Sequence, residues 1–363
     1  MSTCHPHISV IVACRNEKDS IRACISSALS QEGIAGDLEV ICVDGNSIDG
    51  TVEIIEELCK RYPNVVLRHN AAGYVASGLN LGIKFAKGDV IVRMDAHTEY
   101  APDYVRMCLQ TLNLTGADNV GGPARTSSKT YVQRAVAAAY HSRASVGGAL
   151  FHNTSYTGWV DTVPYGCWHK EAFVRFGLFD EDLIRNQDDE HNQRIIRQGG
   201  KVWQSADIRS WYSPRSSLTS LFAQYMQYGY WKVEVIRKHR GAASLRHLIP
   251  VMCIVLLTLL ALVPLYNVAV CAVTAIPGVP MFPRWVIHAD LLCVVVLGVS
   301  YICLVSAASF ECANRAGWDL LPILPLTFPC YHFGYSYGFI RGILDFCVFT
   351  QRRKGVNFNQ LTR

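Results

Sequence analysis

The sequence predicts an α/β domain with a mostly parallel central sheet, followed by an interfacial helix and a membrane region. Short apolar runs alternate with amphipathic helical patterns over about the first hundred residues, which is typical of βαβ units and a right-handed, parallel sheet. Most charged residues lie before Arg246, whereas the chain is strongly apolar from Leu248 onward. We therefore expect a water-soluble part and a membrane part in one chain of 363 residues.

The strands and helices of the first part follow from hydrophobic periodicity. Apolar, β-branched runs predict strands, and stripes such as Ile21, Cys24 and Ile25 predict helices with one buried face. No G-x-G-x-x-G turn follows the first strand, which argues against a dehydrogenase-type dinucleotide fold. The expected strands cover residues 8–13, 38–43, 65–68 and 90–94, and the expected helices cover about 20–29, 52–61 and 75–86.

The pattern loosens after Pro102. We expect a strand over 159–165, a short helix over 170–176, and a longer helix that opens at Asp188 and stops at Gly199. Two further strands over 201–206 and 208–213 complete the soluble core.

Charge and cysteine usage indicate the surroundings of the chain. A net charge of +5 gives no case for nucleic acid. The 14 cysteines contain no C-x-x-C pair, which indicates a reducing compartment, and the N-terminus lacks the layout of a signal peptide. We therefore expect the soluble part in the cytosol. A basic cluster before the apolar region suits the cytoplasmic face of a membrane: Arg237, Lys238, Arg240 and Arg246.

The second part predicts membrane segments. An amphipathic, aromatic helix over 218–240 suits the membrane interface. Apolar runs over 248–276, 291–310 and 320–340 are each long enough for the roughly 20 residues of a spanning helix. Three crossings would leave the basic residues 352–354 outside, against the positive-inside bias, so the number of crossings stays open. The expected parts are an α/β domain (1–217), an interfacial helix with a basic linker (218–247), a membrane region (248–350) and a basic tail (351–363).

Three acidic clusters follow predicted strands or open a helix: 44–49, 95–97 and 188–190. In open α/β sheets, ligands bind at the carboxyl ends of the strands, where such side chains would meet. Each cluster also has a plain structural interpretation, as turn residues, as a surface histidine, or as acids that suit a helix dipole.

Together the clusters suggest metal-assisted handling of a diphosphate. The metal would lie between Asp95, His97 and the diphosphate oxygens. Mg²⁺ prefers oxygen ligands, so the imidazole favours Mn²⁺. An acceptor hydroxyl needs a base within hydrogen-bond reach, and a carboxylate at Asp188 or its neighbours is the natural candidate.

The chain from Ile8 to about Lys232 resembles the family 2 glycosyltransferases, which have the nucleotide-sugar-binding fold called GT-A. The stretches NQDDEHNQR and QYGYWK are most similar to membrane-bound exopolysaccharide glycosyltransferases of the succinoglycan type. The matching pieces are ISVIVACRNE (8–17), DGNSIDGT (44–51), the DxD-like DAH (95–97), YGCW (165–168) and QDDE (187–190).

This resemblance implies the donor-side roles. Glu17 and Asp44 would contact the nucleoside, with the main chain near Ala13 close to the base. Asp95 would face the ribose and diphosphate. His97, where the family usually has an acid, would bind the divalent metal, Mn²⁺ or Mg²⁺.

The resemblance also implies a base and an acceptor side. Asp188 would be the general base of a single inverting displacement, but Asp189 or Glu190 could be the base instead because Gln187 departs from the usual acid–acid pair. The acceptor motif of processive relatives lacks its Arg here, which argues against a processive synthase. The expected acceptor-side residues are Gly166, Cys167, Trp168, Gln227 and Trp231.

We therefore expect a multi-pass protein of the cytoplasmic membrane whose catalytic domain faces the cytosol. It would move a hexose from a nucleoside diphosphate sugar, expected to be a UDP-sugar, to a lipid-linked saccharide in exopolysaccharide or cell-envelope glycan synthesis. A polyprenyl-phosphate sugar synthase and a non-catalytic membrane scaffold are the alternatives. The sequence does not define the sugar, the acceptor, the linkage or the oligomeric state.

Overall fold

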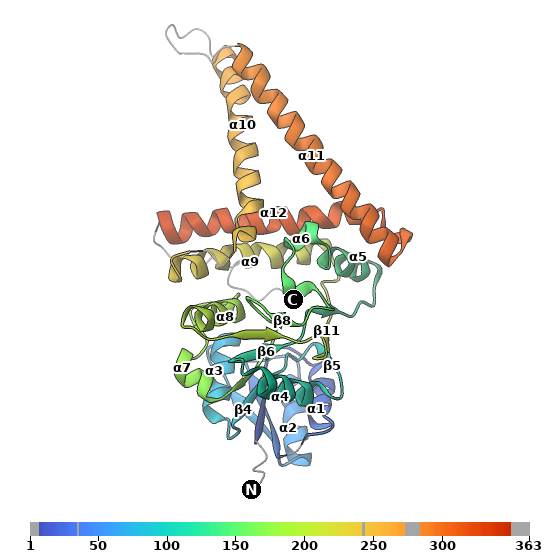
Figure 1. Cartoon of the computed structure of the whole chain (residues 1–363), viewed down its shortest axis with the longest axis vertical. Coiled ribbons are helices and arrows are strands. Elements are labelled where there is room, and N and C mark those ends of the chain that lie inside the picture. Colours follow the sequence, from blue (N-terminus) through green and yellow to red (C-terminus); the bar gives the residue numbers. More distant parts are fainter. Residues whose placement is uncertain (1–6, 35, 242–243, 273–283, 350–363) are drawn as a thin grey trace. The chain divides into compact units, whose positions relative to one another are not determined.

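The computed structural model describes residues 7–34, 36–241, 244–272 and 284–349 (Figure 1). The chain forms two compact units. The α/β unit comprises residues 1–128, 149–214 and 234–243, and the helical unit comprises 129–148, 215–233 and 244–363. Each unit is therefore built from separate stretches of sequence, whereas the sequence analysis expected consecutive parts. The expected basic tail over 351–363 lies outside the described residues.

The central sheet of the α/β unit has eight strands in the order β3-β2-β1-β4-β9-β6-β10-β8. The first four in sequence pair in parallel, as expected, and β6 also runs parallel to β10. β9 is antiparallel to both β4 and β6, and β8 is antiparallel to β10. The strands are β1 (Ile8–Cys14), β2 (Leu38–Asp44), β3 (Val65–His69), β4 (Val90–Arg93), β6 (Asn119–Gly121), β8 (Gly158–Trp159), β9 (Cys167–His169) and β10 (Val202–Gln204).

Helices cover both faces of this sheet (Figure 1). Alternate residues of a strand point to opposite faces, so Val10 and Val12 of β1 join one core and Ile11 joins the other. The first core receives α1 (Ile21–Leu29), α2 (Thr51–Arg61) and α4 (Tyr104–Thr115), and the second receives α3 (Val75–Phe85), α7 (Glu171–Phe176) and α8 (Gln187–Arg197).

A second, three-stranded sheet has the order β5-β11-β7. β11 (Ser210–Tyr212) pairs antiparallel with β5 (Thr98–Tyr100) and parallel with β7 (Arg125–Thr126). β5 begins directly after His97, so this sheet holds the end of the loop that carries the expected metal ligands.

The chain differs from expectation around residues 159–168. The expected strand over 159–165 is reduced to β8, and a strand that was not expected, β9, follows at Cys167–His169. Tyr165 and Gly166 have φ values of 62° and 112°, so extended backbone cannot continue through them. The chain turns at this point and re-enters the sheet as the antiparallel strand β9.

The helical unit contains α5 (Tyr131–Tyr140), α6 (Arg143–Val146), α10 (Ile249–Ala272), α11 (Arg284–Ala316) and α12 (Leu324–Ile343). α9 (Leu218–Lys238) begins in this unit and ends in the α/β unit. Short 3-10 turns cover Leu245–His247 and Trp318–Leu320, a π-helical turn covers Leu344–Val348, and a further 3-10 turn at Leu150–His152 lies in the α/β unit.

Glycines let α9 and α12 approach closely within the helical unit. A Cβ added at Gly338 would lie 1.8 Å from the carbonyl oxygen of Met226, and one at Gly334 would lie 2.9 Å from that of Phe222. Small residues spaced by four permit this backbone contact.

Within the described residues, one helix is long and apolar enough to cross a membrane. It covers Leu291–Ala316, an apolar stretch of 26 residues of which little is buried inside the protein. A shorter apolar helix covers Ile249–Leu260. The third expected segment forms α12, which buries Phe328, Tyr331 and Ser336 inside the protein. The described chain therefore supports one candidate span rather than three.

Candidate active site

The structure brings two of the three acidic clusters onto one guanidinium. Arg93 is the last residue of β4, and its side chain is only 5% exposed. Its Nε donates to Asp95 Oδ1 at 2.9 Å and its Nη2 donates to Asp95 Oδ2 at 3.2 Å. Its Nη1 donates to Asp188 Oδ1. The predicted donor-side acid and the predicted base are therefore neighbours across a single buried cation.

Burial and charge act together on these groups. Burial raises the pKa of the Asp188 carboxyl above its ordinary value of 3.8, Arg93 opposes the shift and Asp95 adds to it. Burial alone would lower the pKa of the Arg93 guanidinium, but Asp188 and Asp95 together raise it above its ordinary value. Asp188 keeps 28% of its side chain exposed, so a carboxylate with a raised pKa faces the solvent at this edge of the sheet.

Buried side chains hold the loop after β4 in place. The Asp95 N–H donates to the Tyr100 hydroxyl oxygen at 2.6 Å, and the Thr98 and Tyr165 hydroxyls form a hydrogen bond of 2.8 Å. Burial raises the pKa of both tyrosines, so both hydroxyls keep their protons. These contacts fix the main chain that carries Asp95.

His97 faces an acid from the loop after β1. Its Nδ1 lies 3.5 Å from Glu17 Oε1, and its side chain is 37% exposed. Glu17 is anchored, because its N–H donates to Thr51 Oγ1 at 2.8 Å and its Oε2 accepts from Ser20 Oγ at 2.7 Å. The structure thus pairs a predicted nucleoside-binding acid with the predicted metal-binding imidazole.

Asp44 ends β2 at the same carboxyl edge of the sheet and is 2% exposed. Its Oδ2 accepts from the Ser47 N–H at 3.1 Å, but its Oδ1 is buried without a hydrogen-bond partner in the described structure. A buried acceptor without a partner is costly, so a ligand N–H or O–H would stabilise it. Ala13, expected near the base, lies in the adjoining strand β1 and pairs with Val43.

Asn16 links two loops next to Asp44 by hydrogen bonds. Its backbone has a φ of 55°, its N–H donates to Ser47 Oγ at 2.8 Å, and its Oδ1 accepts from the Ile48 N–H at 2.9 Å. The loops after β1 and β2 are therefore tied together next to Asp44.

The acids that open α8 have different surroundings. Glu190 is buried and pairs with Arg194 at 2.8 Å and with His239 Nε2 at 3.0 Å. Asp189 is half-buried. Of the three predicted bases, Asp188 is the one that contacts Arg93, which also binds the donor-side acid Asp95. Glu190 instead makes structural contacts with Arg194 and His239. Lys238, the last residue of α9, forms an ion pair with Asp180 in this region.

The structure places the expected acceptor-side residues in two groups. Cys167 and Trp168 lie in β9 and are 0% and 2% exposed, so their side chains belong to the core. Gly166 is required there, because a Cβ at its φ of 112° would lie 2.3 Å from the Trp168 ring. Gln227 and Trp231 lie in the helical unit, 0% and 6% exposed.

A divalent metal would need ligands beyond the protein. No three His, Cys, Asp or Glu side chains converge as a metal site within the described residues. Asp95 and His97 offer one carboxylate and one imidazole on the same short loop. Arg93 engages both Asp95 oxygens, but each carboxylate oxygen has a further lone pair. These donors suit an ion that takes its other ligands from diphosphate oxygens and water.

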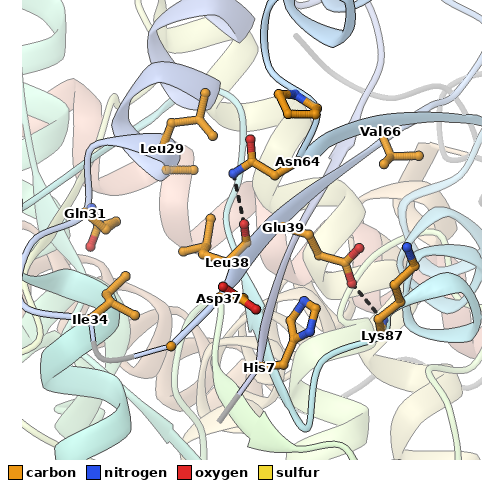
Figure 2. A pocket seen from close by; sticks show the side chains of 13 residues that line it. His7, Leu29, Gln31, Ile34, Asp37, Leu38, Glu39, Asn64, Val66 and Lys87 are labelled. Atoms are coloured by element: carbon orange, nitrogen blue, oxygen red, sulfur yellow. Dashed lines mark hydrogen bonds between the residues drawn. The ribbon is translucent and has the colours of Figure 1, made fainter. Parts of the chain in front are cut away.

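A separate pocket of about 510 Å³ lies at the opposite edge of the sheet, where β1 and β2 begin (Figure 2). Two hydrogen bonds in its wall lie within the protein: Asn64 Nδ2 donates to the Leu38 carbonyl at 2.9 Å, and the Lys87 N–H donates to Glu39 Oε1 at 2.7 Å. It lies at the far end of the strands that carry Asp44 and Arg93, so it is not the site of the acidic clusters.

Arg93 is a residue of the site that the sequence motifs did not predict. A signal was present, because a lone cation ends an otherwise apolar strand, VIVR, and a buried cation requires acidic partners. What sequence alone could not supply was the second partner, Asp188, which lies 95 residues further along the chain.

Comparisons with known proteins bear on the family and the fold of the chain. The family model described as "Glycosyl transferase family 2" matches residues 9–182. The chain is 31% identical to the succinoglycan biosynthesis protein ExoA of Rhizobium meliloti over 245 residues, 67% of this chain and 74% of that protein. It is 29% identical over 254 residues to a dolichyl N-acetyl-alpha-D-glucosaminyl phosphate 3-beta-D-2,3-diacetamido-2,3-dideoxy-beta-D-glucuronosyltransferase of Methanococcus voltae, covering 67% of this chain and 77% of that one.

Among solved structures, the chain resembles the mannosyltransferase PcManGT from Pyrobaculum calidifontis in complex with GDP-Man and Mn²⁺. The TM-score is 0.56 at 17% identity, covering 94% of this chain and 88% of that one. At this identity the likeness concerns the fold.

Proposed function

The chain belongs to glycosyl transferase family 2, and we propose that it transfers a hexose from a UDP-sugar to a lipid-linked saccharide with inversion at the anomeric carbon. It is a glycosyltransferase, and its α/β unit has the GT-A fold. The observation that carries the mechanistic proposal is the pairing of Asp95 and Asp188 on the buried guanidinium of Arg93.

The donor would bind at the carboxyl ends of β1, β2 and β4. Asp44 supports this role because its Oδ1 is buried and unpartnered, and the N3–H of a uracil could donate to it. Glu17 and the main chain near Ala13 border the same edge. Asp95 would face the ribose and diphosphate, where its partial exposure of 21% leaves it accessible.

A divalent ion, Mn²⁺ or Mg²⁺, would be held by Asp95 and His97. When bound it supplies positive charge that stabilises the departing nucleoside diphosphate. An imidazole among the ligands favours Mn²⁺ over Mg²⁺.

Asp188 would accept the proton of the acceptor hydroxyl as the hydroxyl oxygen forms its bond to the anomeric carbon and the bond to the diphosphate breaks. One displacement of this kind inverts the anomeric centre. A base works best with a pKa near the operating pH, and burial raises the pKa of Asp188 in that direction. The proposed acceptor-side residues stay Gly166, Cys167, Trp168, Gln227 and Trp231.

We place the protein in the cytoplasmic membrane with the α/β unit in the cytosol. Support comes from the apolar helix Leu291–Ala316 and the cations Arg237 and Lys238 near the end of α9. The names of two relatives point to exopolysaccharide and dolichyl-linked glycans, so the acceptor would be a saccharide whose lipid stays in the bilayer. Several crossings remain part of this proposal.

The test is a donor screen on the full-length protein in lipid nanodiscs. UDP-sugars and GDP-mannose are offered with Mn²⁺ and a pooled extract of lipid-linked saccharides, and the lipid products are analysed by mass spectrometry. We expect one hexose to be added to an existing saccharide. A single sugar on a polyprenyl phosphate would instead identify a polyprenyl-phosphate sugar synthase.

Variants separate catalysis from scaffolding. Asp188→Asn should lower kcat by about 100-fold or more, the usual contribution of a general base. Asp182→Asn, the same change on an exposed residue nearby, is the matched control and should leave kcat unchanged. Full activity of Asp188→Asn would remove the assigned base. No binding of any nucleotide sugar would support the scaffold alternative.

A further inference from the structure

Each of the three guanidinium nitrogens of Arg93 donates to a carboxylate of the proposed site. Three of its nitrogens donate: Nε and Nη2 to Asp95, and Nη1 to Asp188. The side chain is 5% exposed, whereas Asp95 and Asp188 keep 21% and 28%. A buried guanidinium thus reaches outward to two acids that contact solvent, a costly arrangement unless every charge is paired.

Arg125, in the same unit, is an arginine whose hydrogen bonds serve the structure of the protein. Arg125 Nη1 donates to the Ile208 carbonyl at 3.2 Å, and its Nη2 donates to the Ala206 and Thr154 carbonyls at 2.7 and 3.1 Å. Its donors therefore tie main-chain segments together. The donors of Arg93 reach only side chains that the mechanism uses.

The guanidinium is planar and rigid, so its orientation is fixed once it binds Asp95 through two bonds. Fixing that plane also fixes the direction of Nη1, and hence the position of the Asp188 oxygen that accepts from it. Among the described residues, Arg93 is the one hydrogen-bond partner found for either carboxylate. The relative placement of the two acids therefore depends on this one side chain.

We propose that Arg93 is a positioning residue. Its rigid guanidinium holds the carboxylate of the base Asp188 in a fixed position relative to the donor-side carboxylate of Asp95. The inference rests on the proposed function, because it takes Asp95 as the donor-side acid and Asp188 as the base. It adds a residue that the motifs do not contain, and it links donor and acceptor chemistry through a direct contact.

The test compares Arg93→Lys with Arg93→Ala in the full-length protein in nanodiscs. Lysine keeps the charge but cannot bind two carboxylates in a fixed plane. Misplacement of reacting groups by about 1 Å can cost on the order of 100-fold in rate. We therefore expect Arg93→Lys to lower kcat by about 100-fold, while the KM for the donor changes much less and the melting temperature stays within a few degrees of wild type.

Arg93→Ala provides a rescue experiment. Millimolar guanidinium should enter the space left by the side chain and restore part of kcat, whereas methylammonium at the same concentration should not, because it lacks the planar fork. Arg125→Lys is the matched control: it should lower the melting temperature without lowering the kcat of the folded protein, and guanidinium should not raise its activity.

The outcomes are distinct. Wild-type kcat in Arg93→Lys overturns the proposal, and so does a loss of kcat no larger than that of Arg125→Lys. A loss of kcat in Arg93→Lys, together with recovery of kcat in Arg93→Ala by guanidinium but not by methylammonium, supports it. Recovery of kcat by both cations would show that charge rather than alignment matters, and this result also overturns the proposal. If Arg93→Ala does not fold, Arg93→Lys decides alone. If the wild-type protein transfers no sugar, the proposed function fails, and that result is seen before any variant is compared.

Discussion

His191 should make the α/β unit sensitive to mild acid. Its imidazole is 0% exposed, its ring lies 4.7 Å from that of Phe179 and stacks on Phe173 at 5.4 Å, and its Nε2 lies 3.1 Å from the Gly177 carbonyl oxygen. Burial lowers the pKa of His191 from 6.5 to about 3, and the nearby Arg194 acts in the same direction. The folded protein therefore holds this side chain neutral.

The sign of the effect follows from proton linkage. Below pH 6.5 the unfolded chain takes up a proton at this position, while the folded protein does so only near pH 3. The stability contributed by the neutral ring is complete above pH 6.5 and is lost as the pH falls towards 3. The loss amounts to about 2 kcal/mol at pH 5 and roughly 5 kcal/mol in all.

The assay is urea unfolding of the full-length protein in detergent at pH 7.5 and pH 5, followed by intrinsic fluorescence. His191→Phe keeps an aromatic ring among Phe173 and Phe179 but cannot titrate. We expect the wild type to lose about 2 kcal/mol more than this variant between the two pH values. His169→Phe, on an exposed histidine, is the control and should keep the wild-type pH dependence. Equal pH dependence of wild type and His191→Phe would refute the reasoning.

Three further predictions concern the site and the helical unit. Because burial raises the pKa of Asp188, kcat should fall with acid through a pKa above 3.8, and a pH–kcat profile flat down to that value would contradict its role as base. His97→Asp should shift the metal preference from Mn²⁺ towards Mg²⁺ without abolishing activity, measured as sugar transfer after chelation and metal add-back; an unchanged preference would exclude His97 as a ligand. Gly338→Ala should destabilise the helical unit by about 1–3 kcal/mol, because the new Cβ would lie 1.8 Å from the Met226 carbonyl oxygen. Gly298→Ala is the control, because a Cβ there would have nothing within 4 Å and should not destabilise the unit. Thermal unfolding in detergent compares the two variants, and equal melting temperatures would show that α9 and α12 can move apart.

Local patterns predicted much of the α/β unit. The runs that became β1 to β4 are β-branched and apolar, and amphipathic helices connect each of them to the next, so the parallel order follows from short right-handed connections. The family membership and the GT-A fold that the motifs indicated are confirmed. The carboxyl edge of the sheet also collects Asp44 and Asp95, as expected from the strand ends.

Non-local packing could not be predicted in the same way. β9 is an isolated three-residue strand whose partners, β4 and β6, lie far away in sequence. Trp168 was expected on the acceptor side by resemblance, and nothing near it in sequence shows that Phe173 and His191 pack against its ring. Composition also fails to distinguish a membrane span from a helix buried inside a protein, so the apolar run that forms α12 was expected to cross the bilayer.

The contacts of Lys238 and His239 have a consequence for synthesis of the protein. The α/β unit needs residues 234–243, and these emerge from the ribosome only after the part of α9 that belongs to the helical unit. Until then, Glu190 lacks His239 and Asp180 lacks Lys238. Translation up to residue 217 therefore leaves the nascent α/β unit incomplete, and the helix that opens at the proposed base gains its last partners late in synthesis.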